Sequence, residues 1–240
     1  MNPSKLTLLL TRPAPASARF AAEVEGQLGA FAEVIASPIL EIVPLVPFPG
    51  VPDGATLAFT SENAVRVAAP FLSAPGRVVW CVGPRTAEAA REAGLVPKDA
   101  QGDAADLAAL LATDAPRGDI VHLSGLHQAG DLVARLRRAG LAARRVAIYD
   151  QIARPLSEAA LAAFDGARPI ILPLFSPRSA RLLAGALPGR PRAPVAPVFF
   201  SQAVAAAWGP KPPPGVTAED PNADAMITAI AHAIDTFSDA

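Results

Sequence analysis

The chain has 240 residues, enough for one large domain or two domains of ordinary size, and its formal net charge of −1 gives no overall positive field for nucleic acid. No uninterrupted apolar run approaches the roughly 20 residues of a membrane-spanning helix. The single cysteine, Cys81, lies within an apolar run and no secretory signal pattern is evident, so we expect a cytoplasmic protein with a buried thiol.

The predicted elements alternate between short apolar strands and amphipathic helices. Residues 6–10 form an apolar run typical of a buried parallel strand, and residues 17–28 place apolar side chains at helical spacing. Residues 33–44 are β-branched and interrupted by prolines, which predicts a strand and then an extended crossing into a second unit. Residues 144–155 have the same character and predict a crossing back. The N-terminal strand and helix then join the C-terminal half of the chain.

The sequence repeats a pattern of an apolar strand, a turn with hydroxyl side chains, and a helix. Residues 56–65 show it first, with the strand ending at Thr60 and Ser61, where a side chain can cap the helix. Residues 170–180 repeat the pattern about 115 residues later, with Ser176 in the place of Ser61. Because the first N–H groups of a helix lack partners within it, such a turn is a candidate anion site.

Two further turns are echoed at nearly the same offset. The turn at Gly83 corresponds to Ser201, and the helix start at Asp103 corresponds to Asn222. Three ordered echoes predict two copies of one α/β unit, and the alternation of elements predicts doubly wound parallel sheets of the flavodoxin or Rossmann kind. We expect a discontinuous domain of residues 1–37 plus 153–240, an inserted domain of residues 43–147, and linkers at about 38–42 and 148–152.

Candidate functional side chains follow the ends of the predicted strands. Hydroxyls and arginines in these turns can bind an anion, although they can also serve as helix caps or solvated charges. The three histidines show no ligand spacing, so no metal site is expected. Tyr149, the only tyrosine, can donate a proton or hydrogen bond to a ligand or pack in the linker. Arg144 and Arg145 are expected on a solvated surface with the arginines of the preceding helix.

Proline is frequent, with 26 residues distributed along the chain. Two proline-rich segments, residues 188–197 and 210–215, are expected to form stiff surface loops, and a polyproline ligand for a partner is the alternative.

Five fragments, taken in their order and spacing, carry a resemblance to a known family. They are Leu-Leu-Thr-Arg-Pro at 9–13, Phe-Thr-Ser-Glu-Asn-Ala-Val at 59–65, Val-Gly-Pro-Arg-Thr-Ala at 82–87, Tyr-Asp-Gln at 149–151 and Phe-Ser-Pro-Arg-Ser-Ala at 175–180. With them the chain resembles the uroporphyrinogen-III synthase family over nearly its full length. Where that family often has a second Gly-Pro-Thr-Thr-Ala-like turn, residues 201–205 read Ser-Gln-Ala-Val-Ala, so the hydroxyl in the middle of that turn is absent.

The resemblance implies an enzyme that cyclises linear hydroxymethylbilane to uroporphyrinogen III, with loss of water and inversion of the last pyrrole ring. It implies no metal or organic cofactor. From the charge, the apolar runs and the single cysteine we expect no nucleic-acid or membrane partner and a cytoplasmic protein, and we expect a monomer. Two domains would be joined by a two-stranded connection, with the bilane in the cleft between them. Tyr149 is the candidate catalytic residue. The candidate substrate-binding residues are Arg12, Thr60, Ser61, Arg85, Thr86, Ser124, Gly125, Ser176, Arg178 and Ser201.

Two alternatives remain open at this point. The first is a non-catalytic binding protein of the same two-domain form that holds a tetrapyrrole or another polyanion, which the loss of the second hydroxyl-bearing turn would favour. The second is a flavodoxin-like protein that binds a nucleotide or flavin phosphate at the turn of Thr60 and Ser61.

Overall fold

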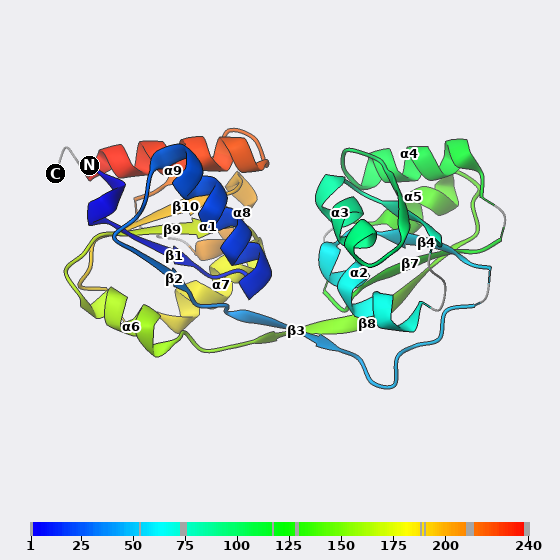
Figure 1. Ribbon diagram of the computed structural model, residues 1–240, viewed down its shortest axis with the longest axis horizontal. Coiled ribbons are helices and arrows are strands. Elements are labelled where there is room, and N and C mark those ends of the chain that lie inside the picture. The colour runs from blue at the N-terminus through cyan, green and yellow to red at the C-terminus, as the bar shows by residue number, and fades with distance from the viewer. Residues whose placement is uncertain are drawn as a thin grey trace. The chain divides into compact units, whose positions relative to one another are not determined.

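A computed structural model gives the fold of the protein (Figure 1). It describes residues 2–52, 54–72, 76–116, 118–127, 130–187, 189, 191–209 and 214–237. The chain divides into two compact units: unit 1 is Met1–Glu41 with Ala153–Ala240, and unit 2 is Ile42–Ile152. Each unit is a largely parallel sheet with helices on both faces, so the predicted fold class is confirmed.

Unit 2 contains a six-stranded sheet in the order β3-β8-β7-β4-β5-β6. All neighbours from β8 to β6 are parallel. The first strand, β3, is antiparallel to β8. Two hydrogen bonds show this: Leu45 N–H donates to the Ile148 carbonyl, and the earlier residue Ile39 accepts from the later residue Arg154. The strands are β3 (Leu40–Pro44), β4 (Thr56–Phe59), β5 (Val78–Cys81), β6 (Val96–Asp99), β7 (Ile120–Gly125) and β8 (Ala143–Ala153).

Two pairs of helices cover the two faces of this sheet (Figure 1). Leu57 and Phe59 of β4 pack with α2 (Glu62–Ala68) and α3 (Pro84–Glu92). Ala58 points to the other face and packs with α4 (Ala104–Asp114) and α5 (Leu132–Arg138), as the alternation of side chains along a strand requires. A short 3-10 turn, η2 (Ala69–Phe71), extends α2.

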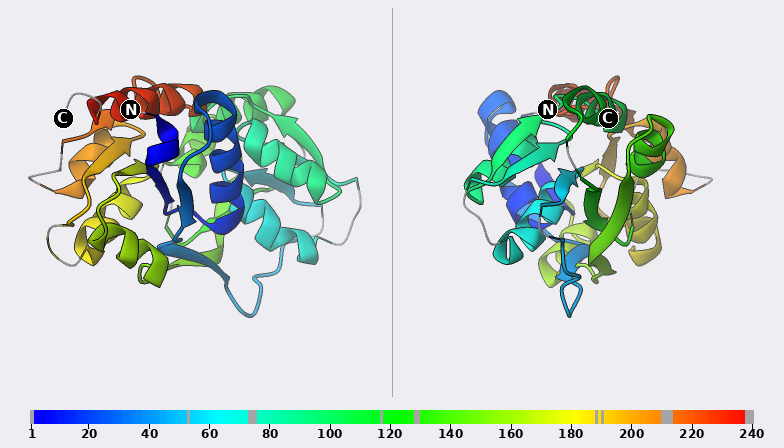
Figure 2. Two further views of the ribbon diagram at one scale, coloured as in Figure 1. Left: turned by 60° about the vertical axis from the view of Figure 1, so that its left-hand side comes forward. Right: turned by 90° about the vertical axis from the view of Figure 1, so that its right-hand side faces the viewer.

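Unit 1 contains a five-stranded parallel sheet in the order β11-β10-β9-β1-β2. One face packs against α1 and α9, and the other packs against α6, α7 and α8. Figure 2 shows the blue N-terminal elements and the red α9 in this same unit. The elements are η1 (Pro3–Lys5), β1 (Thr7–Leu10), α1 (Ala14–Leu28), β2 (Glu33–Ala36), α6 (Glu158–Asp165), β9 (Ile170–Leu174), α7 (Pro177–Ala186), β10 (Val195–Phe199), α8 (Gln202–Trp208), β11 (Val216–Thr217) and α9 (Ala223–Thr236).

The two sheets share one strand order, although the chain enters them at different strands. The order β11-β10-β9-β1-β2 in unit 1 corresponds to β6-β5-β4-β7-β8 in unit 2. The caps agree as well, since Asp103 begins α4 and Asn222 begins α9, each accepting from the backbone two or three residues later. Unit 1 is therefore a circularly permuted copy of the parallel part of unit 2.

The elements missing from the sequence prediction are β6, β11 and α6. In one proline-rich segment, residues 195–197 belong to β10 and are not part of a loop, while residues 188 and 190 lie outside the described part of the chain. Residues 210–213 of the other segment lie outside it too.

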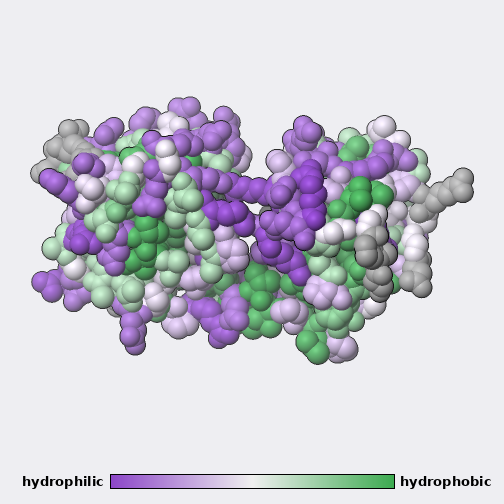
Figure 3. Space-filling model, in the orientation of Figure 1, coloured by the Kyte–Doolittle hydropathy of each residue, from purple (hydrophilic) through white to green (hydrophobic). Residues whose placement is uncertain are grey.

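No helix within the described residues is long and apolar enough to cross a membrane. The face drawn in Figure 3 mixes hydrophilic with hydrophobic residues on both units.

Candidate functional site

Each sheet has one topological switch point, which is the place where the connections from two neighbouring strands run in opposite directions along the sheet. In unit 2 this point lies between β4 and β7, and in unit 1 it lies between β1 and β9. Ligands of open α/β sheets bind beyond the carboxyl ends of the strands at such a point. Thr60 and Ser61 directly follow β4, and Ser124 and Gly125 end β7. The fold therefore brings these four predicted residues to one edge of unit 2.

Tyr149 lies on β8 with its side chain in the core of unit 2 and only 3% exposed. Burial raises the pKa of its phenol, and hydrogen bonds with the Ser61 side chain and the Gly125 backbone, together with the charge of Arg145, act in the opposite direction. The phenol is therefore protonated at neutral pH, so its O–H can donate a hydrogen bond. Tyr149 thus belongs to unit 2 and contacts two other predicted site residues, Ser61 and Gly125.

Ser61 also caps α2, because its Oγ accepts a hydrogen bond from Asn63 N–H at 3.2 Å. One of the N–H groups of the predicted anion site is thus already satisfied by the protein itself. The hydroxyl of Ser61 contributes to both the helix cap and the Tyr149 contact.

Arg145 on β8 is a site residue that the sequence analysis missed. Its Nε donates to Ser124 Oγ at 2.8 Å, and its guanidinium also binds the carbonyls of Gly125 and Leu126. Arg145 is exposed, as expected, but the parallel register also places it beside His122 of β7, where its guanidinium reaches the carbonyls at the end of that strand. Arg145 fixes the end of β7 and places a positive charge at the sheet edge.

His122 is the second missed residue. It is 3% exposed, and its Nε2 lies 2.9 Å from Thr60 Oγ1. Burial, aided by the charge of Arg145, lowers its pKa from 6.5 to about 4, so the ring is neutral at neutral pH. Only the pairing of β4 with β7 brings these two residues together, because 62 positions separate them in the chain.

The turn before α3 differs from the turn before α2. Gly83 is the N-cap of α3 and supplies no side-chain cap, while Arg85 is exposed and Thr86 is 4% exposed in the first turn. Cys81, just before this turn, is buried, and its pKa is raised to about 12 mainly by desolvation, so the thiol is inert.

The predicted residues of unit 1 follow β1, β9 and β10. The Arg12 guanidinium lies 4.3 Å from the centre of the Phe175 ring, a cation–π arrangement at the switch point of this sheet. Ser176 caps α7 by accepting from Ser179 N–H at 3.0 Å, and Arg178 is half-buried in the first turn of that helix. Ser201 begins α8 but makes no side-chain cap hydrogen bond.

Asp103, the predicted helix start that corresponds to Asn222, is engaged in a capping box at the start of α4. Hydrogen bonds from the backbone N–H groups of Ala105 and Asp106 hold its pKa below the usual range. Its carboxylate therefore stabilises the helix start.

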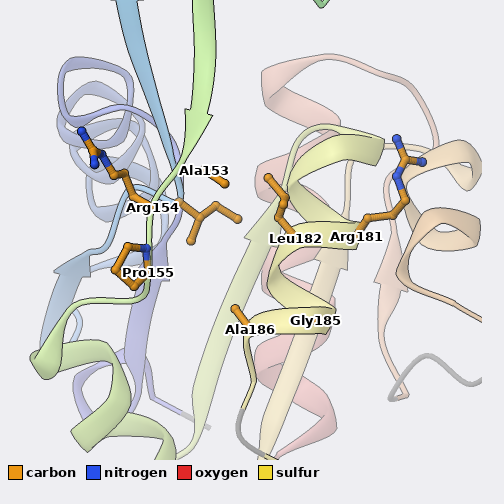
Figure 4. A pocket seen from close by; sticks show the side chains of 8 residues that line it. Ala153, Arg154, Pro155, Arg181, Leu182, Gly185 and Ala186 are labelled. Atoms are coloured by element: carbon orange, nitrogen blue, oxygen red, sulfur yellow. The ribbon is translucent and has the colours of Figure 1, made fainter.

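A cavity of about 390 Å³ lies in unit 1 between α7 and the end of β8 (Figure 4). It contains none of the predicted site residues, and the guanidinium of Arg181 points away from it. Arg154, also in its lining, pairs with Glu41. No group of three metal-ligating side chains occurs within the residues that the structure describes.

Comparison with known proteins identifies the family. The family model described as uroporphyrinogen-III synthase HemD matches residues 20–228. The chain belongs to the uroporphyrinogen-III synthase family. The predicted activity is thereby confirmed: the protein is a lyase that cyclises hydroxymethylbilane in tetrapyrrole biosynthesis. Family membership also favours this enzyme over the two alternatives raised by the sequence.

Solved structures of this family align with most of the chain. Uroporphyrinogen-III synthetase from Helicobacter pylori is 13% identical with a TM-score of 0.65, and the match covers 95% of this chain and 99% of that one. A mutant uroporphyrinogen III synthase from Thermus thermophilus is 18% identical with a TM-score of 0.44, covering 96% and 99%. Among curated proteins, no sequence match is found.

Proposed function

We propose that the side chains at the two switch points bind the carboxylates of the bilane. The observation that carries this proposal is the gathering of Ser61, Gly125 and Tyr149 with Arg145 at the edge of unit 2 where Thr60 also lies. A near-neutral chain must hold a polyanion through local donors, and this edge offers hydroxyls and a guanidinium together.

In this proposal the turn before α3 supplies a second group of donors. The N–H groups of its first turn are not taken by a side-chain cap, and the exposed Arg85 stands beside them. In unit 1 the proposed carboxylate donors are Arg12, Arg178 and Ser201, whose hydroxyl makes no cap hydrogen bond to α8. Ser124 acts indirectly by holding Arg145.

Tyr149 and Ser61 are proposed to assist departure of the substrate hydroxyl. Because the pKa of the phenol is raised, Tyr149 is a weaker acid than free tyrosine and donates a hydrogen bond more readily than it gives up a proton. Ser61 is half-buried at the edge of unit 2 and bonded to the phenol, so it can pass this polarisation to a bound group.

We also propose that the enzyme is a cytoplasmic monomer that does not bind nucleic acid and works without a metal or organic cofactor. The lone buried thiol supports the cytoplasmic location, and the net charge of −1 supports the absence of nucleic-acid binding. Sedimentation of the purified protein at several concentrations checks the oligomeric state.

The decisive test supplies enzymatically generated hydroxymethylbilane to chelator-treated protein and separates the type I and type III products. Spontaneous closure gives type I, so the wild type is expected to give type III. Arg12→Gln and Arg145→Gln should each raise KM and shift product toward type I. The exposed Arg138 of α5 offers a matched control, and Arg138→Gln should behave as wild type. Wild-type KM in both site variants would refute the proposed binding roles.

A further inference from the structure

His122 occupies an unusual place for a histidine, in the middle strand pair of a buried sheet. Its register partners are Ala58 on β4 and Arg145 on β8, and its ring is 3% exposed. One ring nitrogen, Nε2, meets Thr60 Oγ1 at 2.9 Å. The other, Nδ1, is fully buried and has no hydrogen-bond partner among the described residues.

The unpartnered Nδ1 decides which nitrogen carries the proton. If Thr60 donated to Nε2, the proton of a neutral ring would sit on Nδ1 as a buried N–H without an acceptor. Buried N–H groups without partners are rarer in proteins than acceptors left unpaired. The ring therefore carries its proton on Nε2, donates it to Thr60 Oγ1, and leaves Nδ1 as a bare lone pair.

This tautomer sets the direction of the threonine hydroxyl. Once Oγ1 accepts from His122, the hydrogen of the Thr60 hydroxyl is free to donate elsewhere. Thr60 is half-buried and directly follows β4, at the carboxyl edge of the sheet. We propose that His122 is a positioning residue for substrate: through its Nε2–H it holds Thr60 so that the threonine O–H donates to a carboxylate of the bilane. This inference rests on the proposed role of Thr60 in binding.

The permuted copy in unit 1 provides an internal comparison. Leu8 pairs with Ile171 there as Ile120 pairs with Thr56 in unit 2, so Leu10 stands in the place of His122. By the same correspondence Phe175 stands in the place of Thr60. The unit 1 sheet forms with Leu10 at this position, so the architecture does not require a histidine. Among the described residues, the polar pair lies in unit 2, where Ser61 and Tyr149 also lie.

The tautomer can be tested without any activity measurement. NMR of the folded enzyme with isotope-labelled histidine distinguishes a protonated ring nitrogen from a bare one by chemical shift. We expect the His122 signals to show a protonated Nε2 and an unprotonated Nδ1 at neutral pH. A ring protonated at Nδ1 would overturn the inference, whatever the kinetics show.

The effect on substrate is tested by a double-mutant cycle with Thr60→Val. His122→Leu should raise KM by about threefold to tenfold, the value of one hydrogen bond, with a smaller change in kcat. His122→Gln, whose side-chain amide reaches about as far as Nε2, should restore much of the loss, while the shorter His122→Asn should not. In the Thr60→Val background, His122→Leu should have no further effect on KM.

The outcomes separate the two claims. Independent, multiplying effects of His122→Leu and Thr60→Val would overturn the positioning role. If Thr60→Val leaves KM unchanged while NMR shows the Nε2–H tautomer, the binding role of Thr60 fails and the positioning role fails with it, although the hydrogen bond itself stands. Should His122→Leu fail to fold, the Gln and Asn pair still decides the matter, because equal KM values for these two variants would contradict the inference.

Discussion

The ring of Tyr149 lies directly against the backbone of Gly125, so close that a β-carbon built at position 125 would lie 2.6 Å from Cε2 and 2.7 Å from Cζ of the tyrosine. Any side chain at position 125 must displace the ring. The glycine is needed here for space, because the two strands pair irregularly at Ser124 and Gly125 and the tyrosine fills the gap. Position 125 therefore determines where the phenol lies.

Gly125→Ala is expected to lower turnover by moving Tyr149 and to reduce the free energy of unfolding by about 1 to 3 kcal/mol through overpacking. Kinetics and urea unfolding measure the two effects. Gly26→Ala in α1 is the control, since a β-carbon there meets nothing within 4 Å and should be neutral or stabilising. In a Tyr149→Ala background the added methyl should be tolerated. An undiminished loss in that background would show that the ring is not the obstacle.

Tyr149→Phe should lower turnover by roughly 10- to 100-fold, because it removes one donor and keeps the ring. Its Ser61 and Gly125 contacts are lost as well, so the free energy of unfolding should fall by about 1 kcal/mol. Ile148→Val, at the neighbouring buried position, should cost a similar amount of stability with no loss of turnover. Wild-type turnover in the phenylalanine variant would reduce Tyr149 to a packing residue.

Ser61 combines a helix cap with a proposed contact to substrate, and two substitutions separate them. Ser61→Ala should lower the free energy of unfolding by about 1 kcal/mol and raise KM, because both functions are lost. Ser61→Asp should keep the cap and thus most of the stability, while its charge repels the substrate carboxylates and raises KM further. Thermal melting and steady-state kinetics are the measurements. An aspartate variant with wild-type KM would place Ser61 outside the binding surface.

His122 should make the protein sensitive to mild acid. Its pKa is about 4 in the folded state and 6.5 for an ordinary histidine, so protonation favours the unfolded chain. Its stabilising contribution is fully present above pH 6.5 and is lost as the pH falls toward 4, by about 3 kcal/mol in total. Urea unfolding at both pH values should show a smaller acid loss for His122→Leu than for wild type.

A control separates this titration from a general loss of stability. Val121→Ala, at the adjacent buried position of β7, should be destabilising by the same amount at both pH values. Equal acid losses in wild type and His122→Leu would assign the pH dependence to other groups.

The local signals in the sequence predicted most of the fold. The apolar run ending at Thr60 and Ser61 gave a buried strand and a capped helix because both depend on neighbouring residues. Edge strand β6 escaped prediction because it is short, contains Pro97 and is only partly buried. Its pairing with β5 makes it a strand despite this weak pattern.

The site could be predicted only in part, because two of its contacts depend on strand register. The resemblance selected Tyr149 and Ser61, and the fold brings them together. Arg145 and His122 were missed because nothing near either residue in sequence reveals its partner on another strand. A polar residue within an apolar strand is the signal that could have found His122, since a buried polar side chain must meet a partner, whereas the exposed Arg145 carries no such signal.

The permuted arrangement of unit 1 has a consequence for protein synthesis. Its strand β1 pairs with β2 and with β9, but β9 emerges from the ribosome only after the whole of unit 2. At typical rates of translation, the apolar side chains of β1 and α1 remain without their partners in unit 1 for on the order of 10 seconds. Unit 2 is contiguous and can fold during that interval. The apolar side chains of the nascent N-terminal segment are thus exposed to aggregation during that interval.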